Sequence, residues 1–156
     1  MEDFTVDFLK NNKACNLKVI SKCNLNCHFC YETNTNSSML SLEKIESILK
    51  DLSDLGFKKL NLSGGEPFLR EDLVNIIIRA KRYNFYLKLA TNGLLINEEK
   101  LLLLDRAGLD QLYISIGDSV HSDILDNFSK MLPSFYRKRV QMQIGVNFII
   151  TKTNLK

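Results

Sequence analysis

Two kinds of apolar pattern alternate along this chain, and their alternation limits the fold more than any other feature. Alternating or short continuous apolar runs predict strands, whereas apolar residues that recur every three or four positions predict helices. The strand patterns cover 17–21, 59–62, 85–90, 111–116 and 142–151, and the helix patterns between them cover 41–55, 71–83, 97–107 and, less regularly, 119–139. Strands that alternate with helices predict a parallel sheet joined by right-handed crossovers.

The predicted ends of several elements carry residues that favour them. Ser41 precedes the first regular helix and is a good N-cap, and Gly56 is expected to stop that helix. Gly108 comes just after the third helix pattern, where it can end the helix. Pro133 lies inside the irregular helical stretch, and we expect it to break or begin a segment there because proline lacks a backbone N–H.

The number of strands sets the class of fold. About five strands with intervening helices give an α/β fold of parallel βα units. A closed eight-stranded barrel of this type needs about 250 residues, and the chain has 156. The sequence therefore predicts a partial, open, TIM-like barrel.

Unusual residues follow the first four predicted strands. A cysteine-rich segment follows the first strand, Gly64-Gly65-Glu66 follows the second, Thr91-Asn92-Gly93 follows the third, and Ser115 and Asp118 lie at the fourth. Ligands of parallel α/β sheets bind beyond the carboxyl ends of the strands. We therefore expect these four segments to converge at one edge of the sheet and to form the functional site.

Three of the four cysteines lie within eight residues, at Cys23, Cys27 and Cys30. Clustered thiols in a reducing compartment are more often metal ligands than disulfides. Thiolates are soft ligands, and three of them on one loop can bind three irons of a cubane cluster and leave the fourth iron open. The remaining cysteine, Cys15, is expected to be a small buried side chain without a functional role.

Two other interpretations of the cysteine segment stay open at this point. His28 lies between two of the cysteines and could complete a Cys₃His zinc site, although its place between two ligands would strain a tetrahedral metal. The cysteines could also bind no metal at all.

The spacing Cys-x₃-Cys-x₂-Cys, with the aromatic Phe29 before the last cysteine, resembles the signature of the radical SAM superfamily. The resemblance implies an enzyme with two cofactors, a [4Fe–4S] cluster and S-adenosylmethionine (SAM). It implies that the amino and carboxylate groups of SAM bind the fourth iron. It further implies that the reduced cluster cleaves SAM to methionine and a 5′-deoxyadenosyl radical, which removes a hydrogen atom from the substrate.

The other segments extend this resemblance. Gly64, Gly65 and Glu66 resemble the family's motif that contacts the SAM amino group, and the turn containing Thr91 and Asn92 is similar to one that lines the pocket. Ser115 and Asp118 resemble a segment that binds the ribose and carboxylate of SAM, although Gly117 and Asp118 stand here in exchanged order. Tyr31 is expected to line the pocket or to shield the cluster.

The chain departs from the family pattern at one further place. Relatives often carry an arginine about a dozen residues beyond the serine of the fourth strand, where it pairs with the SAM carboxylate. This chain has no arginine between Arg106 and Arg137. Either another group binds that carboxylate or SAM is held less tightly.

The motifs around Cys23 and Gly64 most resemble the branch that modifies peptides and proteins, which often carries an extension with auxiliary clusters. We therefore expect one radical SAM core domain over residues 1–156, incomplete at its C-terminal end and without such an extension. The resemblance implies an electron donor such as flavodoxin or ferredoxin and a peptide, protein or small-molecule substrate. The alternative is a non-catalytic module that binds zinc, the cluster or SAM.

Composition and charge indicate the class of protein and its cellular location. Apolar residues make up 45% of the chain and charged residues 25%, which is typical of a soluble globular protein. No apolar run approaches the roughly 20 residues that span a bilayer, and the acidic N-terminus argues against a signal peptide, so we expect a cytoplasmic protein. The net charge is only +3, and the short basic run Arg137-Lys138-Arg139 is more typical of a solvated helix end than of a nucleic-acid site.

Overall fold

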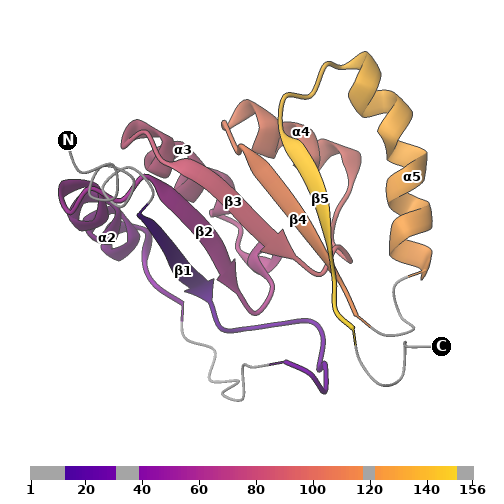
Figure 1. Ribbon diagram of the computed structural model, residues 1–156, viewed down its shortest axis with the longest axis horizontal. Coiled ribbons are helices and arrows are strands. Elements are labelled where there is room, and N and C mark those ends of the chain that lie inside the picture. The colour runs from indigo at the N-terminus through magenta and orange to yellow at the C-terminus, as the bar shows by residue number, and fades with distance from the viewer. Residues whose placement is uncertain (1–12, 31–38, 118–121, 151–156) are drawn as a thin grey trace, which may run out of the picture.

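A computed structural model describes residues 13–30, 39–117 and 122–150 of the chain. Its five strands form one parallel sheet in the order β1-β2-β3-β4-β5 (Figure 1). The strands are β1 (Ala14–Ile20), β2 (Lys59–Gly64), β3 (Tyr86–Thr91), β4 (Gln111–Ile116) and β5 (Gln143–Phe148). The predicted α/β architecture, an open sheet of about five parallel strands, is confirmed.

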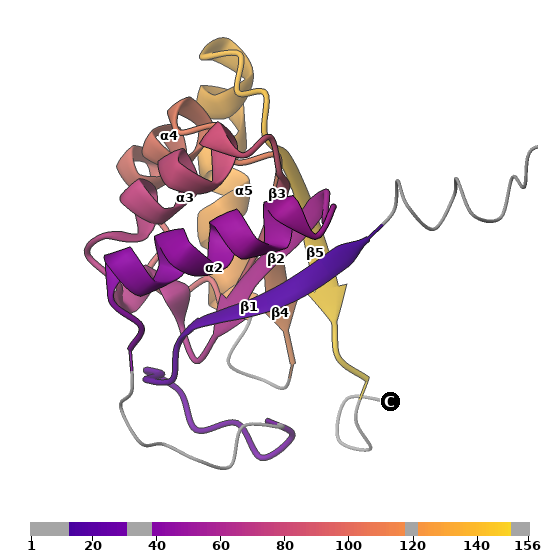
Figure 2. The same ribbon diagram turned by 90° about the vertical axis from the view of Figure 1, so that its left-hand side faces the viewer.

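The helices cover one face of this sheet, as Figure 2 shows edge-on. They are α2 (Leu42–Asp54), the short 3₁₀ helix η1 (Pro67–Leu69), α3 (Leu73–Arg82), α4 (Glu98–Arg106) and α5 (Ser122–Arg137). The core lies between the two layers, and its largest fully buried side chains include Ile45, Leu49, Leu60, Ile76, Phe85, Leu87, Leu101 and Leu112. Within the described residues, no helix lies on the opposite face of the sheet.

The predicted helix ends agree with the structure where capping residues mark them. The Ser41 hydroxyl accepts a hydrogen bond from the backbone N–H of Lys44 at 3.2 Å, as an N-cap does. Gly56 follows the end of α2 with a φ of +78°, a conformation that glycine adopts without a Cβ penalty.

Two expectations differ from the structure. The strand β1 begins at Ala14, three residues earlier than predicted, because Cys15 and its neighbours pair with β2. Pro133 lies inside α5 and does not break or begin it. Packing explains this difference, because Phe128 and Phe135 pack against the core on either side of the proline, with 6.1 Å between their ring centroids.

The carboxyl ends of all five strands lie at one edge of the sheet, since every strand pair is parallel. In Figure 1 the segment that follows β1 turns and passes along this edge below the other strands. In the parts of the chain that the structure describes, no helix combines the length and apolar character needed to cross a membrane.

Candidate functional site

The segment that follows β1 lies directly against the end of β2. The Gly65 N–H donates to the Ile20 carbonyl at 2.8 Å, and the Glu66 N–H donates to the Lys22 carbonyl at 2.9 Å. A Cβ on Gly64 would lie 2.1 Å from the Ile20 oxygen, and one on Gly65 would lie 2.2 Å from the Lys22 oxygen. Both glycines are therefore required for the close approach of the two backbones.

The cysteines of this segment reach the surface at the carboxyl edge. Cys23 and Cys30 are exposed and Cys27 is half-buried, and none forms a disulfide. The Cys30 N–H donates to the Cys27 carbonyl at 3.1 Å, so these two residues share one turn. Over the described ranges, no three Cys, His, Asp or Glu side chains gather at a point that could hold a metal ion. The assignment of the three thiols as ligands therefore stays a prediction.

The donor chemistry of the segment nevertheless fits an iron–sulfur cluster. Its three thiols lie on one short loop next to a backbone that two glycines allow to pack closely. Thiolates are the ligands that such clusters use. The loop thus presents a suitable set of ligands at the edge where parallel sheets bind their ligands.

The loop after β3 also contacts the cysteine segment. The Asn92 side-chain amide donates to the Asn24 side-chain oxygen at 2.8 Å, and its nitrogen lies 3.9 Å from Cys23 Sγ. The Leu25 N–H donates to the same sulfur at 3.4 Å. The sulfur of Cys23 therefore lies against the loop after β3 and the backbone of its own segment.

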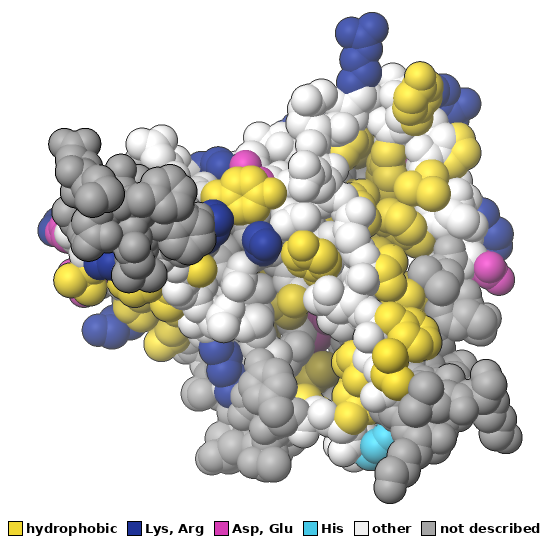
Figure 3. All heavy atoms as spheres, viewed as in Figure 1, with side chains coloured by type: hydrophobic (Ala, Val, Ile, Leu, Met, Phe, Trp, Pro, Cys, Tyr) yellow, Lys and Arg dark blue, Asp and Glu magenta, His cyan; other side chains and the backbone are white. Residues whose placement is uncertain are grey.

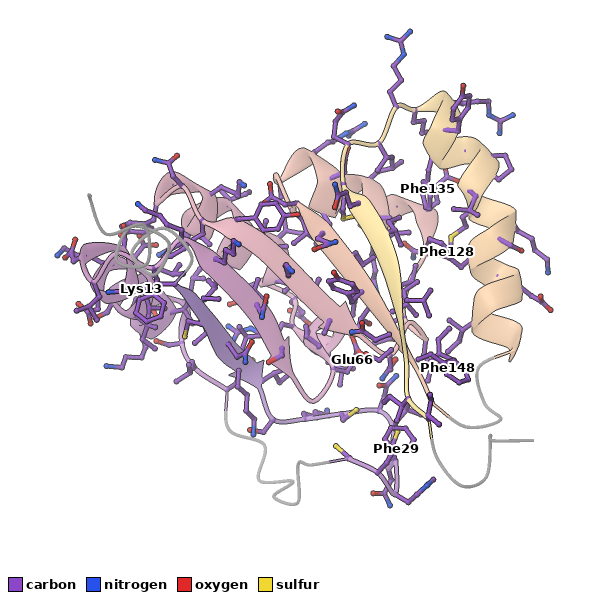
Figure 4. All side chains as sticks on the ribbon, viewed as in Figure 1. Lys13, Phe29, Glu66, Phe128, Phe135 and Phe148 are labelled. Atoms are coloured by element: carbon purple, nitrogen blue, oxygen red, sulfur yellow. The ribbon has the colours of Figure 1, made fainter. Side chains whose placement is uncertain are left out.

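Glu66 joins the ends of β2 and β3 from within the protein (Figure 4). Its Oε1 accepts hydrogen bonds from the Phe68 N–H at 3.0 Å and the Thr91 hydroxyl at 2.8 Å, and its Oε2 accepts one from the Asn92 N–H at 2.8 Å. The residue is 0% exposed. Burial raises the pKa of this carboxyl, while the hydrogen bonds and the charge of Lys100 oppose the rise.

The end of β4 meets the cysteine segment through an aromatic ring. A Cβ on Gly117 would lie 2.2 Å from the Phe29 ring, so the ring packs on the bare backbone of the glycine. The His28 ring meets the Phe29 ring edge-on, with 5.2 Å between the centroids. The exchanged order of Gly117 and Asp118 thus places glycine where the ring leaves no room for a side chain.

The predicted site residues divide into three groups. The structure brings Phe29, Gly64, Gly65, Glu66, Thr91 and Asn92 together around the cysteine segment. Ser115 is half-buried near the end of β4 and is paired in register with Asn147. Tyr31 and Asp118 lie outside the described residues.

Sequence reasoning missed one residue that holds this region together. The Arg70 side chain is buried, and its Nη1 donates to the Val19 carbonyl at 2.6 Å and to the Leu40 carbonyl at 2.9 Å. Its Nε and Nη2 donate to the two carboxylate oxygens of Asp72 at 2.8 and 2.7 Å. Arg70 therefore ties the chain before the cysteine segment to the chain after it.

We expect Arg70→Met to lower the free energy of unfolding by about 3 kcal/mol, because two carbonyls and a carboxylate lose their donors. This value allows for the 31% exposure of the Asp72 side chain, which water can partly solvate. Urea denaturation measures the change. The control is Arg79→Met. The Arg79 side chain is 31% exposed and its partner Glu46 is exposed to a similar extent, so water can solvate both groups and the loss should be clearly smaller than that of Arg70→Met. Equal losses in the two variants would contradict the assignment.

A second prediction follows from the raised pKa of Glu66. Consider pH values between the ordinary pKa of a glutamate, near 4.5, and the raised pKa of Glu66 in the folded protein. In this range Glu66 keeps a proton in the folded protein that it has released in the unfolded chain. The unfolding free energy of the native protein should therefore rise relative to that of Glu66→Gln as the pH falls through this window. Urea denaturation of both proteins at several pH values measures the difference. A difference that is flat, or that shrinks as the pH falls, would argue against a raised pKa.

Known proteins resemble this chain in sequence and in fold. The family profile described as "Radical SAM superfamily" matches residues 17–139. The chain is 38% identical over 100 residues to the PqqA peptide cyclase of Gluconobacter oxydans, covering 62% of this chain and 28% of that protein. It is 33% identical over 149 residues to the probable GTP 3',8-cyclase of Pyrococcus horikoshii, covering 84% of this chain and 47% of that protein.

A solved structure shows the same fold. Streptococcus suis SuiB bound to the precursor peptide SuiA superposes with a TM-score of 0.72 at 22% identity, covering 94% of this chain and 36% of that one. The chain thus spans less than half the length of each of these three proteins.

Proposed function

This chain belongs to the radical SAM superfamily, and on that premise we propose that it is the cluster- and SAM-binding part of an enzyme that starts radical chemistry on its substrate. One observation carries the proposal. A loop with three cysteines is held by hydrogen bonds and packing against the ends of β2, β3 and β4, at the carboxyl edge of an open parallel sheet. The chemistry that a bound [4Fe–4S] cluster supplies in this family is the reductive cleavage of SAM.

The roles of the thiols follow from their number. Cys23, Cys27 and Cys30 would bind three irons, and the fourth iron would be left for the amino and carboxylate groups of SAM. The contacts of Asn92 with Asn24 and Cys23 support this assignment, because they hold the start of the loop against β3. Phe29, packed on Gly117, holds the loop against β4.

The roles at the SAM pocket rest on burial and hydrogen bonding. Glu66 fixes the pocket wall, since three of the roughly four acceptor positions of its carboxylate already bind Phe68, Thr91 and Asn92. Because Glu66 is fully buried, we assign the SAM ammonium to the backbone at Gly64 and Gly65, which Glu66 holds in place from beneath. Ser115 would contact the ribose from β4, and Tyr31 and Asp118 are assigned to the same pocket on the resemblance.

A peptide or protein is the substrate class that we propose. Two of the similar proteins are named with a peptide: the PqqA peptide cyclase, and SuiB bound to its precursor peptide SuiA. The probable GTP 3',8-cyclase provides the small-molecule alternative. The proposed reaction also needs one electron from a donor such as flavodoxin or ferredoxin.

The test is anaerobic reconstitution with iron and sulfide, followed by addition of SAM and a strong reductant. Release of 5′-deoxyadenosine together with bound iron is the expected result. A colourless protein that retains one zinc would contradict the proposal in favour of a zinc site. A cluster-loaded protein that leaves SAM intact would contradict the enzymatic role and leave a binding module.

A further inference from the structure

On the face of the sheet opposite the helices, the five strands present basic side chains and no acidic ones. The five strands contain three lysines, Lys18, Lys59 and Lys88, and no Asp or Glu. Each lysine is next to a buried leucine that points toward the helices, so the lysines point to the other side. Figure 3 views this face and shows basic side chains over β1–β3.

Lys88 lies at the centre of a polar row that crosses the sheet. Its neighbours in register are Asn61 on β2 and Gln111 on β4. Asn61 donates to the Asn16 side-chain oxygen at 2.7 Å, and Gln111 donates to the Gln143 side-chain oxygen at 3.3 Å. Carboxamides therefore extend from this ammonium to both outer strands.

Lys88 differs from several other lysines in its partner. Lys50, Lys81 and Lys138 each pair with a carboxylate. Lys88 pairs with none in the described part of the chain, and its ammonium lies 5.6 Å from the centroid of the Tyr113 ring. The Lys88 residue is half-buried, and its ammonium can form a charge-assisted hydrogen bond with an anion that reaches this face.

The layer between Lys88 and the carboxyl edge contains several small residues. Two positions further along each strand, on the same face, lie Ser63 on β2, Ala90 on β3 and Gly145 on β5. Tyr113 on β4 pairs in register with both Ala90 and Gly145. Four residues, about 13 Å of extended chain, separate Lys88 from Asn92, which lies on the same side by alternation and contacts Asn24 and Cys23. A molecule that contacts Lys88 can therefore extend over the small residues toward the cysteine segment.

We propose that Lys88 binds a carboxylate of the substrate, beside the amides of Asn61 and Gln111. The inference rests on the proposed function, because it places the substrate on the face next to the SAM site. The row that crosses the sheet at Lys88 holds one ammonium among neutral amides, which matches the single charge of a carboxylate, whereas a phosphate chain needs several cations within the same row. Lys88 would thus select an acidic side chain or another organic acid and hold it in place.

The test uses the full chain without cluster, so its outcome is independent of SAM cleavage. The lysines are reductively dimethylated with ¹³C-formaldehyde and a borane reductant, which keeps their charge, and Lys88→Met identifies the methyl signal of Lys88 by its loss. The probes are N-acetylglutamate N-methylamide, its uncharged glutamine counterpart, glutarate and inorganic pyrophosphate. We expect the Lys88 signal to shift with the glutamate probe and to stay in place with the glutamine probe.

Backbone amide signals of Asn61 and Gln111 give a second readout in unmodified protein. Lys88→Met should weaken glutamate-probe binding at least about tenfold, whereas Lys88→Arg and the control Lys44→Met on the helix layer should preserve it. Shifts with the glutamate probe but not glutarate would indicate an amino-acid carboxylate, and equal shifts would indicate any organic acid. An unmoved Lys88 signal, equal shifts with the glutamine probe, or tighter binding of pyrophosphate would overturn the proposal.

Discussion

Cys27→Ala is expected to lower the iron content of the reconstituted protein from about four atoms per chain to less than one, and to abolish release of 5′-deoxyadenosine. The middle cysteine of the segment has no substitute, since the neighbouring thiols belong to other irons in the proposed cluster. The loss of one thiolate from a three-ligand set leaves two irons without protein ligands. Colorimetric iron and sulfide assays on anaerobic protein measure the effect.

The matched control for this prediction is Cys15→Ala. Cys15 lies in β1 and packs against the core, away from the carboxyl edge. Its replacement should leave the iron content unchanged and alter only stability. If the Cys27→Ala protein kept its full iron content, Cys27 would not be a ligand of the cluster.

Gly65→Ala is expected to have the second-largest effect. The new Cβ would lie 2.2 Å from the Lys22 oxygen and 2.6 Å from the Ser21 oxygen, so it meets backbone on the segment that leads into Cys23. Backbone cannot rotate away as the end of a side chain can, and the cysteine segment must shift. We expect a loss of about 3 kcal/mol or more in unfolding free energy, together with poor cluster loading.

Gly56→Ala separates this steric effect from the loss of glycine's conformational freedom. Gly56 has a φ of +78° and open space around its Cβ position, so alanine there costs only backbone strain, about 1–2 kcal/mol. It lies after α2, far along the sheet from the cysteines, and should leave cluster loading intact. Urea denaturation and iron content of the two variants give the comparison. If Gly65→Ala were the milder change, the close approach at Lys22 would be wrong.

Much of the fold could be predicted because burial imposes periodicity. Leu87 and Leu89 alternate with polar residues on β3, and Ile45 and Leu49 recur at helical spacing on α2, so each element reveals its type locally. The convergence of the loops followed from parallel pairing alone. Pro133 was misjudged because the packing of α5 on the sheet, a tertiary effect, outweighs the local preference of proline.

The finer structure of the site could not be predicted, because it depends on contacts between distant segments. Arg70 bonds to Val19 and Leu40, which are 51 and 30 residues away in the sequence. The packing of Phe29 on Gly117 likewise joins two loops that no local pattern relates. Glu66 was identified as a site residue, but its burial and its bonds to Thr91 and Asn92 appear only in three dimensions.

The measurement that tests the central claim most directly is the electron paramagnetic resonance spectrum of the reduced, cluster-loaded protein with and without SAM. Three thiolate ligands leave one iron open, so SAM should bind that iron and change the g-values of the signal. A spectrum that stays the same at saturating SAM would show that SAM does not reach the cluster, and it would contradict the account.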